Sequence, residues 1–566
     1  MSSQTLARLL DRLEELKRPS GASAEARLSN VLAELNKRKF TDASALIRFH
    51  EMLLFMRAYP QSPRLLRQVE AMLKTFARRV LSLQSMDADL SLFADPEVSG
   101  IAGTSLTAIF SYPVARWLAA RHPSEVTIDW EGYEDGARLG ETLPRFVPLL
   151  EEESLVEANI PYTAWLRAAR SRNERELTWL MRRFESLRVP EREKAELYDS
   201  LKLYIIWQPR DFSVTRTGMK RKVSEIFYHD QPLLTRREVS LIAEVNAPPL
   251  PLKKLSRREG AKALDMIRNT STIRYRELHG FTYGDPARVV RAEAGRGVEF
   301  FVCGVGAEHR LPLRTYHSAL IVKNGVPIGY TEGISLFERI ETGINVYYTF
   351  RDGESAWLYG RVMRMFRQLL GVTAFSIDPY QIGFENEEGI ESGAFWFYRK
   401  LGFRPVRSEI DKLVRAEEEK IATRKAYRTN AKILRQMAVG HMLFETQPAT
   451  RSSWDKFQIR NLGLKIQQRM ASSFGGDALK MRRASAASVE RALGVKASQW
   501  KETERRAFEN LALVLSLIPN LARWTKDEKQ AVTRIIRAKA GAEESRYLRL
   551  LQKHRKLRDE IIKLGS

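Results

Sequence analysis

The sequence predicts an α/β core between two mostly helical regions. Apolar runs rich in Val, Ile, Phe and Tyr crowd between residues 287 and 378 and are typical of strands. Segments with helical spacing of apolar residues precede and follow them. With 44% hydrophobic and 29% charged residues, the chain has a globular rather than a disordered composition, and 566 residues suffice for roughly three or four domains.

The N-terminal part, residues 1–245, is predicted to be mostly helical. In residues 1–85, the segment 44–60 has apolar positions at helical spacing, and the prolines that follow end it before a second helix over 64–83. The lone histidine of the first helix, His50, is interpreted as structural. Residues 86–245 are predicted to be mostly helical with an acidic first half, since residues 81–160 carry 4 basic and 14 acidic side chains.

Two segments of this part are predicted to be irregular. The glycines of SGIAGTSL (99–106) resemble a phosphate-binding loop, but the Gly-Lys-Ser/Thr ending is missing, so the segment is interpreted as a loop that leads into a helix. The prolines of residues 246–255 predict a linker, because consecutive prolines block a helix and leave backbone groups unpaired.

The core, residues 256–408, is predicted element by element. Ser256 and Glu259 form a capping box that opens a helix through about Arg268. Asn324-Gly325 between two apolar runs is a strong hairpin signal. Gly371 suits the end of a helix over 354–370. The strands are expected at 287–294, 297–305, 319–336, 343–350 and 372–378, and a short aromatic helix at 392–403.

The net charge of +24 lies mostly in the C-terminal region, residues 409–566, which is predicted to be basic and helical. Residues 411–566 carry 34 basic and 17 acidic side chains. Such an excess favours an anionic partner such as nucleic acid. The alternatives are that this region docks on the acidic stretch of its own chain, or that it is a solvated helical face.

Composition also excludes some classes of site. A single cysteine, Cys303, rules out an internal disulfide and a cysteine-rich metal site, and its apolar surroundings predict a buried inert thiol. The eight histidines show no ligand spacing, so no metal is expected, and His309 and His317 are interpreted as structural. No apolar run is long enough to cross a bilayer and no signal peptide is recognisable, so we expect a cytoplasmic protein without a membrane partner.

An aromatic motif near the end of the core is formed by Ala394, Phe397, Tyr398, Leu401, Gly402 and Phe403. It resembles the GNAT superfamily of N-acyltransferases, which often shows Ala-x-x-Phe-Tyr-x-x-Leu-Gly-Phe after the last helix–strand pair. Together with the element order, the resemblance covers about residues 255–408 and implies a GNAT-like α/β core. An aromatic helix packed in a core is the alternative reading of the motif.

The resemblance also implies where an acyl-CoA would bind. The family's pyrophosphate loop, Arg/Gln-x-x-Gly-x-Gly/Ala, corresponds here to Arg351 and the residues that follow it, with Gly353, Ser355 and Ala356 near the phosphates. Glycines let the backbone approach phosphates, and helix N-termini attract anions. Glu354 replaces the central glycine, and about 4 kcal/mol of repulsion would oppose a phosphate 4 Å away. An ordinary acidic helix N-terminus explains the segment equally well.

The implied mechanism is attack of an amine on the acyl thioester, with acetyl-CoA or another acyl-CoA as co-substrate. By resemblance, Tyr398 would protonate the leaving thiolate. Glu341 is the candidate base, with a water chain as the alternative. Glu391 stands where many family members have an asparagine. The acidic segment 379–393 either gates the amine or is a solvated loop.

Three functions remain open at this stage. The first is an acyl-CoA-dependent N-acyltransferase with an unknown amine acceptor. The second is a non-catalytic GNAT-like scaffold or binding protein whose basic region, residues 411–566, holds nucleic acid or another partner. The third is an aminoacyl-tRNA-dependent transferase on the same fold, which would account for both the altered loop and the basic region.

Overall fold

The computed structural model describes residues 5–18, 22–150, 160–447 and 452–566. The described residues form two compact units, each assembled from separate stretches of the chain. The first comprises Met1–Pro232, Leu264–Thr282 and Lys323–Pro327, and the second comprises Leu233–Ala263, Tyr283–Val322 and Ile328–Ser566.

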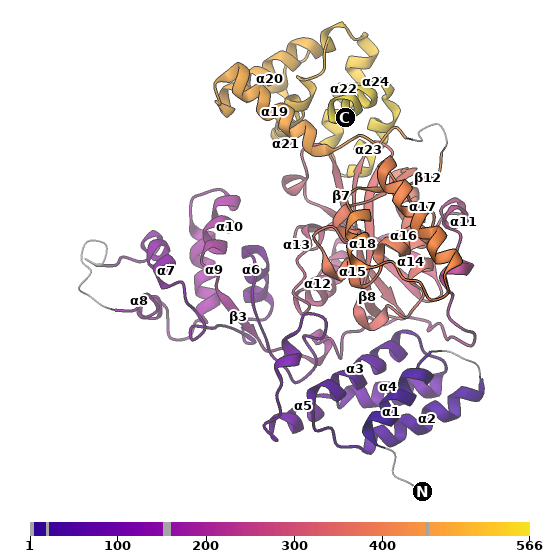
Figure 1. Cartoon of the computed structure of the whole chain (residues 1–566). Helices are drawn as coiled ribbons and strands as arrows, with labels where there is room; N and C mark the ends of the chain where they lie inside the picture. The colour runs from indigo at the N-terminus through magenta and orange to yellow at the C-terminus, as the bar shows by residue number, and fades with distance from the viewer. Residues whose placement is uncertain (1–4, 19–21, 151–159, 448–451) are drawn as a thin grey trace. The chain divides into compact units, whose positions relative to one another are not determined.

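The N-terminal part of the first unit is a helical bundle (Figure 1). His50 is buried inside it, with Nδ1 2.9 Å from a Glu51 carboxylate oxygen and Nε2 2.9 Å from the Thr217 hydroxyl. Since both ring nitrogens have protein partners, His50 is a structural residue, as predicted. The bundle contains α1 Leu6–Leu16, α2 Ala22–Lys37, α3 Ala43–Ala58, α4 Pro63–Lys74 and α5 Ala77–Gln84. The single helix expected over 64–83 is therefore two helices.

The rest of the first unit contains a small antiparallel sheet that the sequence did not predict. Its strands are β1 Leu106–Ile109, β2 Val126–Ile128 and β3 Tyr204–Trp207, in the order β1-β3-β2. Strands of three or four residues are too short for periodicity to reveal them. The helices of this part are α6 Tyr112–Arg121, α7 Gly136–Thr142, α8 Tyr162–Ala169, α9 Glu176–Ser186, α10 Glu191–Ser200 and α13 His279–Thr282.

The glycine-containing segment 99–106 was predicted to lead into a helix, and this prediction is wrong. Gly100 and Gly103 have φ of 78° and 95°, so the chain makes two left-handed turns and then enters β1. Only glycine adopts such angles without strain.

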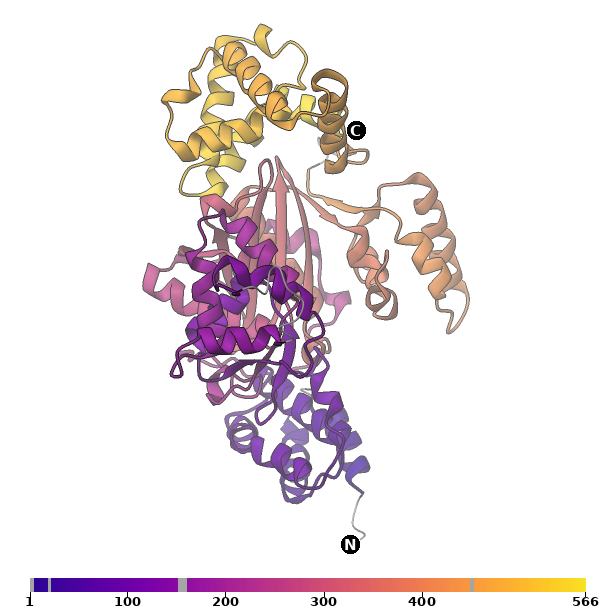
Figure 2. The same ribbon diagram turned by 90° about the vertical axis from the view of Figure 1, so that its left-hand side faces the viewer.

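The second unit is built on a nine-stranded sheet in the order β11-β12-β10-β9-β8-β7-β6-β5-β4, whose long strands Figure 2 shows side by side. Most pairings are antiparallel, but β9 and β10 run parallel. The strands are β4 Leu252–Lys254, β5 Gly284–Gly295, β6 Val298–Val305, β7 Thr315–Lys323, β8 Val326–Leu336, β9 Arg339–Val346, β10 Ala374–Ile377, β11 Arg404–Pro405 and β12 Met442–Glu445. The chain is thus a mixed α/β protein with a mostly antiparallel sheet.

Several local predictions for this sheet are confirmed. Asn324 and Gly325, with φ of 50° and 84°, make the turn between β7 and β8. The expected strands are present, and Cys303 is buried in β6. Two predictions need correction. Residues 252–254 of the expected linker are the edge strand β4, and the strand expected at 343–350 begins at Arg339 and ends at Val346.

Helices connect and flank these strands. α14 Ser355–Leu370 joins the parallel strands β9 and β10, and Gly371 ends it with φ of 73°, as predicted. The capping box of Ser256 and Glu259 opens α12, which runs to Thr272 rather than Arg268. The others near the sheet are α11 Leu241–Asn246, α12 Arg257–Thr272, α15 Glu387–Glu391, α16 Ala394–Lys400, α17 Ser408–Thr423 and α18 Ala431–Met437.

The C-terminal helices gather in a group of their own in both views (Figures 1 and 2). They are α19 Ile459–Phe474, α20 Ala478–Leu493, α21 Glu502–Leu515, α22 Lys526–Lys539, α23 Glu544–Lys553 and α24 Arg555–Gly565. The last helix expected, over 544–564, is divided at His554. Among the described residues, no helix combines the length and the apolar character needed to cross a membrane.

Residues beyond 408 also complete the sheet. β12 pairs with β10 through Ala374–Glu445 and with β11 through Arg404–Leu443. The basic C-terminal region therefore contributes a strand to the same sheet that holds β9 and β10, a contribution that the sequence did not predict.

Candidate active site

The predicted pyrophosphate loop leads into the first turn of α14. Glu354 is the residue before the helix and is only 1% exposed. Arg296 donates to both of its carboxylate oxygens, at 2.5 and 3.1 Å, and the Leu234 amide donates to one of them at 3.1 Å. The charge that would oppose a phosphate is therefore neutralised by an arginine 58 residues earlier in the chain.

Arg351, the first residue of this loop, lies at the surface. It forms an ion pair with Glu388 of α15, and its Nε donates to the Val346 carbonyl at 3.3 Å. Glu387, the neighbour of Glu388, pairs with Arg435 of α18 at 2.7 and 3.0 Å. The acidic segment 379–393 is therefore not simply a solvated loop, because its two glutamates at the start of α15 bind arginines from other elements.

Tyr398 projects from α16 toward β9. Its side chain is buried, and its ring packs edge-on against Tyr359 and Phe403. The Ile344 amide donates to its hydroxyl at 3.5 Å. Burial raises the pKa of Tyr398 to about 12, so the hydroxyl keeps its proton at neutral pH.

The Tyr398 hydroxyl lies where β9 and β10 part. Their parallel pairing ends at Glu341 and Ser376, so among the described residues the β9 edge beyond Glu341 has no strand partner on that side. Two tyrosine hydroxyls replace it: Tyr359 donates to the Thr342 carbonyl at 3.3 Å, and Tyr398 accepts from Ile344. A strand edge that no other strand covers is where a ligand with amide groups pairs with backbone, although here the tyrosine hydroxyls already bind two of the edge groups.

Gly343 lies at the centre of this region. A Cβ there would be 2.8 Å from the Gln381 side-chain oxygen and 3.3 Å from the Tyr398 hydroxyl. The Tyr398 hydroxyl therefore sits over the face of β9 to which a side chain at 343 would point. No residue other than glycine fits without moving one of these groups.

Glu332 of β8 is directly opposite Gly343 in the antiparallel ladder. Residues opposite each other point to the same face, with Cβ atoms about 4.5–5.5 Å apart, so Glu332 and Tyr398 flank Gly343 from two sides. On the other face, the Thr331 hydroxyl donates to the Gly343 carbonyl and the Thr342 hydroxyl to the Glu332 carbonyl, both at 2.6 Å. These bonds fix the register.

The Glu332 carboxyl group is perturbed by its surroundings. The Tyr316 hydroxyl donates a hydrogen bond to it, and burial raises its pKa to about 7. A carboxyl group with that pKa exists in both protonation states near neutral pH, which suits proton transfer. Sequence reasoning did not select Glu332. The available signal was an acidic residue inside the apolar run GYTEGISL.

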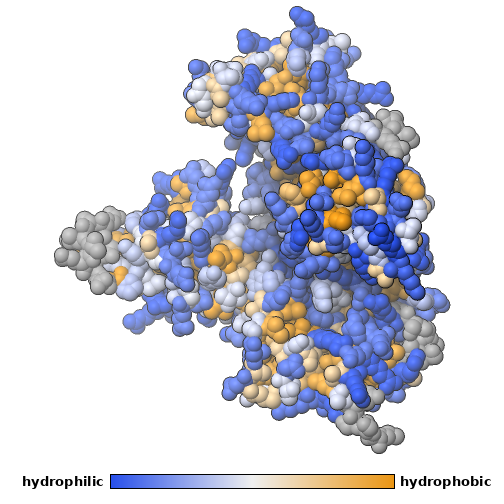
Figure 3. Space-filling view, in the orientation of Figure 1, coloured by the Kyte–Doolittle hydropathy of each residue, from blue (hydrophilic) through white to orange (hydrophobic). Residues whose placement is uncertain are grey.

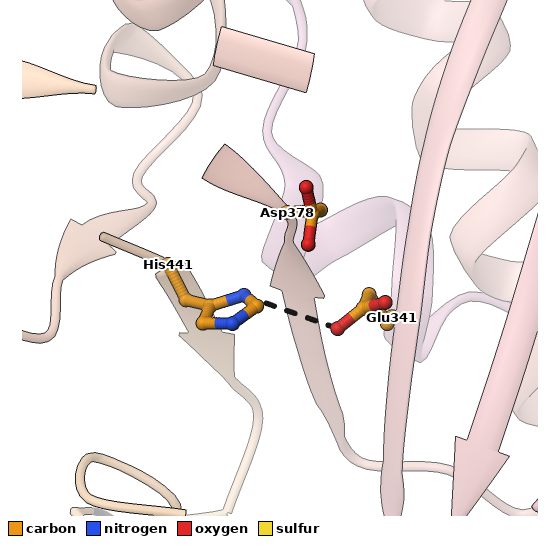
Figure 4. A group of neighbouring side chains, drawn as sticks. All are labelled: Glu341, Asp378 and His441. Atoms are coloured by element: carbon orange, nitrogen blue, oxygen red, sulfur yellow. Dashed lines mark ion pairs between the residues drawn. The ribbon is translucent and has the colours of Figure 1, made fainter. Parts of the chain in front are cut away.

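A cavity of about 550 Å³ opens on the same face of β9, two residues before Gly343. Glu341 from β9, Asp378 after β10 and His441 before β12 line it, and their ligand-type atoms all lie within 4.8 Å of one another. Figure 4 shows the three side chains converging from their separate strands. The cluster joins residues up to 100 positions apart, so spacing in the sequence could not reveal it.

His441 is neutral in this cluster. Burial lowers its pKa, and Arg339 lowers it further against the opposing effect of Glu341. Its Nδ1 is 3.3 Å from the Ile377 carbonyl and 3.9 Å from a Glu341 oxygen. Two carboxylates and a neutral imidazole are residue types that hold a divalent cation. Here Arg339, whose Nη2 is 3.6 Å from Glu341, already supplies positive charge.

The residues predicted from the sequence thus occupy two places. Tyr398 and Glu341 lie near successive positions of one face of β9, whereas the loop Arg351–Ala356 lies beyond the end of that strand. The histidines considered earlier are elsewhere: His309 stacks on Tyr283 with ring centroids 4.0 Å apart, and His317 is in β7.

Comparison of the chain with protein-family models, with curated proteins and with solved structures found no match.

Proposed function

We propose that this protein is an acyl-CoA-dependent N-acyltransferase whose reaction takes place over Gly343. The observation that carries the proposal is the placement of a proton donor, Tyr398, and a proton acceptor, Glu332, on two sides of a strand position that has no side chain. The GNAT resemblance of the aromatic motif independently assigns the acid role to Tyr398.

The donor would bind along the β9 edge and at the start of α14. The pyrophosphate would accept hydrogen bonds from the first-turn amides of Ser355 and Ala356, which a helix leaves without internal partners. Arg351 would add a positive charge at the surface. Because Arg296 neutralises Glu354, the acidic replacement in the loop does not oppose this arrangement. The acyl thioester would then reach the gap between β9 and β10.

The reaction follows from these positions. The amine nitrogen attacks the thioester carbonyl, a C–N bond forms, and the C–S bond breaks. Glu332 takes the proton that the nitrogen loses, and Tyr398 gives a proton to the departing thiolate, so the products are an amide and free CoA thiol. Glu341, the base expected from the sequence, contacts Arg339 and His441, which favours a binding role for its carboxylate.

The direct test has two parts. Titration of acetyl-CoA and longer acyl-CoAs into the full chain by calorimetry should show binding, and release of CoA thiol in the presence of a panel of primary amines should show turnover. Glu332→Gln should abolish most turnover and keep donor binding, whereas Glu293→Gln, at an exposed carboxylate of β5, should change neither. No donor binding by the wild type would overturn the proposal.

A second candidate function, nucleic-acid binding, is favoured by the surface of the C-terminal helices. Residues 459–566 carry 24 basic and 11 acidic side chains. Arg537 lies over the Trp500 ring, 4.7 Å from its centroid. Three further exposed basic residues are near these two in the sequence: Arg534 is one turn away on α22, and Lys496 and Lys501 lie on either side of Trp500. We call this group the Trp500 patch: Lys496, Trp500, Lys501, Arg534 and Arg537. Figure 3 shows mainly hydrophilic residues over the visible face of these helices.

None of the four cations of the Trp500 patch has a carboxylate partner within the described residues. Cations around an aromatic ring suit a phosphate backbone with exposed bases. Removal of residues after 410 would not test this, because β12 would be lost from the sheet. The better test is Lys501→Glu with Arg534→Glu, measured by fluorescence anisotropy with a single-stranded oligonucleotide at several salt concentrations. Unchanged binding by this variant would exclude the patch.

A further inference from the structure

The cavity beside Glu341 contains two arginines that serve different partners. Arg339 is buried, donates to the Ser376 hydroxyl at 3.0 Å, and lies over the rings of Trp454 and Phe457 at 5.6 and 6.0 Å from their centroids. Its charge is shared with Glu341 at 3.6 Å. Arg339 is therefore held by several contacts where it lines the cavity.

Arg314 lines the same cavity from the segment before β7 and is half-buried. Within the described residues, no carboxylate lies within ion-pair distance of it. The charge of Arg314 acts on Arg339. Burial is the largest cause that lowers the pKa of Arg339, and the Arg314 charge lowers it further. Arg339 is offset by Glu341, whereas Arg314 has no such partner among the described residues, so a ligand carboxylate at Arg314 would supply the missing opposite charge.

The opposite charge lies next to this pair. Glu341 and Asp378 line the cavity together with the neutral His441. Along one face of β9, residues 339, 341 and 343 follow at intervals of about 6.6 Å, so an anion-binding residue, a cation-binding residue and the proposed reaction position come in that order. An apolar wall is formed by Ile334, Leu336, Val406, Leu443 and Trp454, and the charged residues Glu385, Arg407, Asp455 and Arg460 also line the cavity.

We propose, on the basis of the proposed function, that the acyl acceptor is a zwitterion with an apolar body, of the class of free hydrophobic amino acids. Its ammonium group binds at Glu341 and Asp378, at the end of the cavity that faces Gly343, and must release one proton to solvent before the resulting amine attacks the thioester and gives its second proton to Glu332. Its carboxylate binds Arg314 and Arg339, and its side chain packs on the apolar wall. The volume of about 550 Å³ leaves room for such a molecule.

The test measures binding to the full chain without any acyl donor. Three probes of similar shape separate the contribution of the carboxylate to binding from that of the ammonium group. They are L-phenylalanine, phenethylamine, which lacks the carboxylate, and 3-phenylpropionate, which lacks the ammonium group. L-Leucine and L-methionine test the breadth of the apolar wall. By calorimetry in buffer with EDTA, at least one amino acid should bind, and the two single-charge analogues should bind at least about tenfold more weakly than L-phenylalanine if that is the preferred body.

Variants assign the contact. Arg314→Gln should weaken amino-acid binding by about tenfold or more and leave phenethylamine binding unchanged, because only the carboxylate contact is lost. Arg491→Gln, at an exposed arginine of α20 outside the cavity, is the matched control. Equal binding of phenethylamine and L-phenylalanine, equal affinity of Arg314→Gln and wild type, or no binding by any hydrophobic amino acid would each overturn the inference.

The outcome is separable from that of the proposed function. Amino-acid binding without CoA release in the presence of acyl-CoA would keep the zwitterion site and overturn the transferase. CoA release with amines that lack a carboxylate, but not with amino acids, would keep the transferase and overturn this acceptor class.

Discussion

The loop that begins α14 and the cavity beside Glu341 differ in whether their charged side chains are paired. In the loop, Glu354 is bound by Arg296, and Arg351 is bound by Glu388, so each charged side chain has a partner. In the cavity, Arg314 is left without a carboxylate among the described residues, while Glu341 and Asp378 lie close together. Charged side chains that are paired with each other stabilise the fold, whereas unpaired ones are suited to binding a ligand of opposite charge.

The two regions also differ in the groups that can bind a ligand, which are backbone amides in the loop and side chains in the cavity. At the start of α14, what remains available to an anion is the set of first-turn amides, beside a surface arginine that is already paired with Glu388. In the cavity, side chains from β9, the segment after β10 and the segment before β12 supply the charges. The comparison therefore predicts that mutations in the loop act mainly on stability, whereas mutations over Gly343 and in the cavity act on turnover and acceptor binding.

The largest expected effect is on turnover at the reaction position. Tyr398→Phe keeps the ring that packs against Tyr359 and should keep the fold, and Glu332→Gln keeps the shape of the side chain. Each should lower kcat by roughly 10²–10⁴-fold, because each removes one proton-transfer group. Single-turnover kinetics with saturating donor is the measurement. Turnover within twofold of wild type would remove that residue from the mechanism.

The second prediction concerns the saturated pair in the loop. Arg296→Ala leaves the Glu354 carboxylate buried without its cation and should lower the free energy of unfolding by about 3 kcal/mol. The double change with Glu354→Gln should recover a large part of that loss, because the uncompensated charge is gone. Urea unfolding followed by circular dichroism measures both. Arg415→Ala, at an exposed pair with Asp411, is the control and should cost less than about 1 kcal/mol.

The third prediction is a pH dependence assigned to Glu332. Its pKa is raised to about 7 in the folded protein, so the base form is gained, and kcat should rise, as pH increases through 7. The stability of the fold depends on pH in the opposite direction. The folded state binds more protons than the unfolded state between about pH 4.5 and 7, so the contribution of Glu332 to stability falls as pH rises through that window. Both dependences should disappear in Glu332→Gln.

The smallest expected effect is on donor affinity at Glu354. Since Arg296 already neutralises this carboxylate, Glu354→Gln should change the Kd for acyl-CoA by less than about tenfold, or about 1.4 kcal/mol. Calorimetry with acetyl-CoA measures it. A gain much larger than tenfold would mean that the carboxylate repels the donor, and the loop would then resemble the cavity instead of contrasting with it.

Local signals in the sequence predicted the local structure. The hairpin at Asn324-Gly325, the capping box at Ser256 and the helix end at Gly371 each depend on residues within a few positions of one another, and all are present. Two features were not predicted. The division of the helix after Pro63 was missed because its apolar pattern is continuous, and the strands of the first unit were missed because three or four residues are too few for periodicity to reveal.

The candidate site was predicted only where a family motif or a neighbouring pattern marked it. Tyr398 stood in the aromatic motif, and Glu341 was noted because it lies close to an expected strand. Glu332 became significant only through its register opposite Gly343, and Arg296 through the turn between β5 and β6 that carries it to Glu354. Such pairings depend on strand register and on chain paths of tens of residues, which a single sequence does not determine.

The position of β12 has a consequence for how the chain is made. β12 lies between β10 and β11, although its Glu445 comes 71 positions after the partner Ala374 in β10. A ribosome that adds about 5–20 residues per second needs roughly 4–14 s to cover that distance. During that time one edge of β10 is unpaired, and an open strand edge is a template for intermolecular association. Nascent or prematurely terminated chains of this protein are therefore expected to depend on chaperones until Glu445 has emerged.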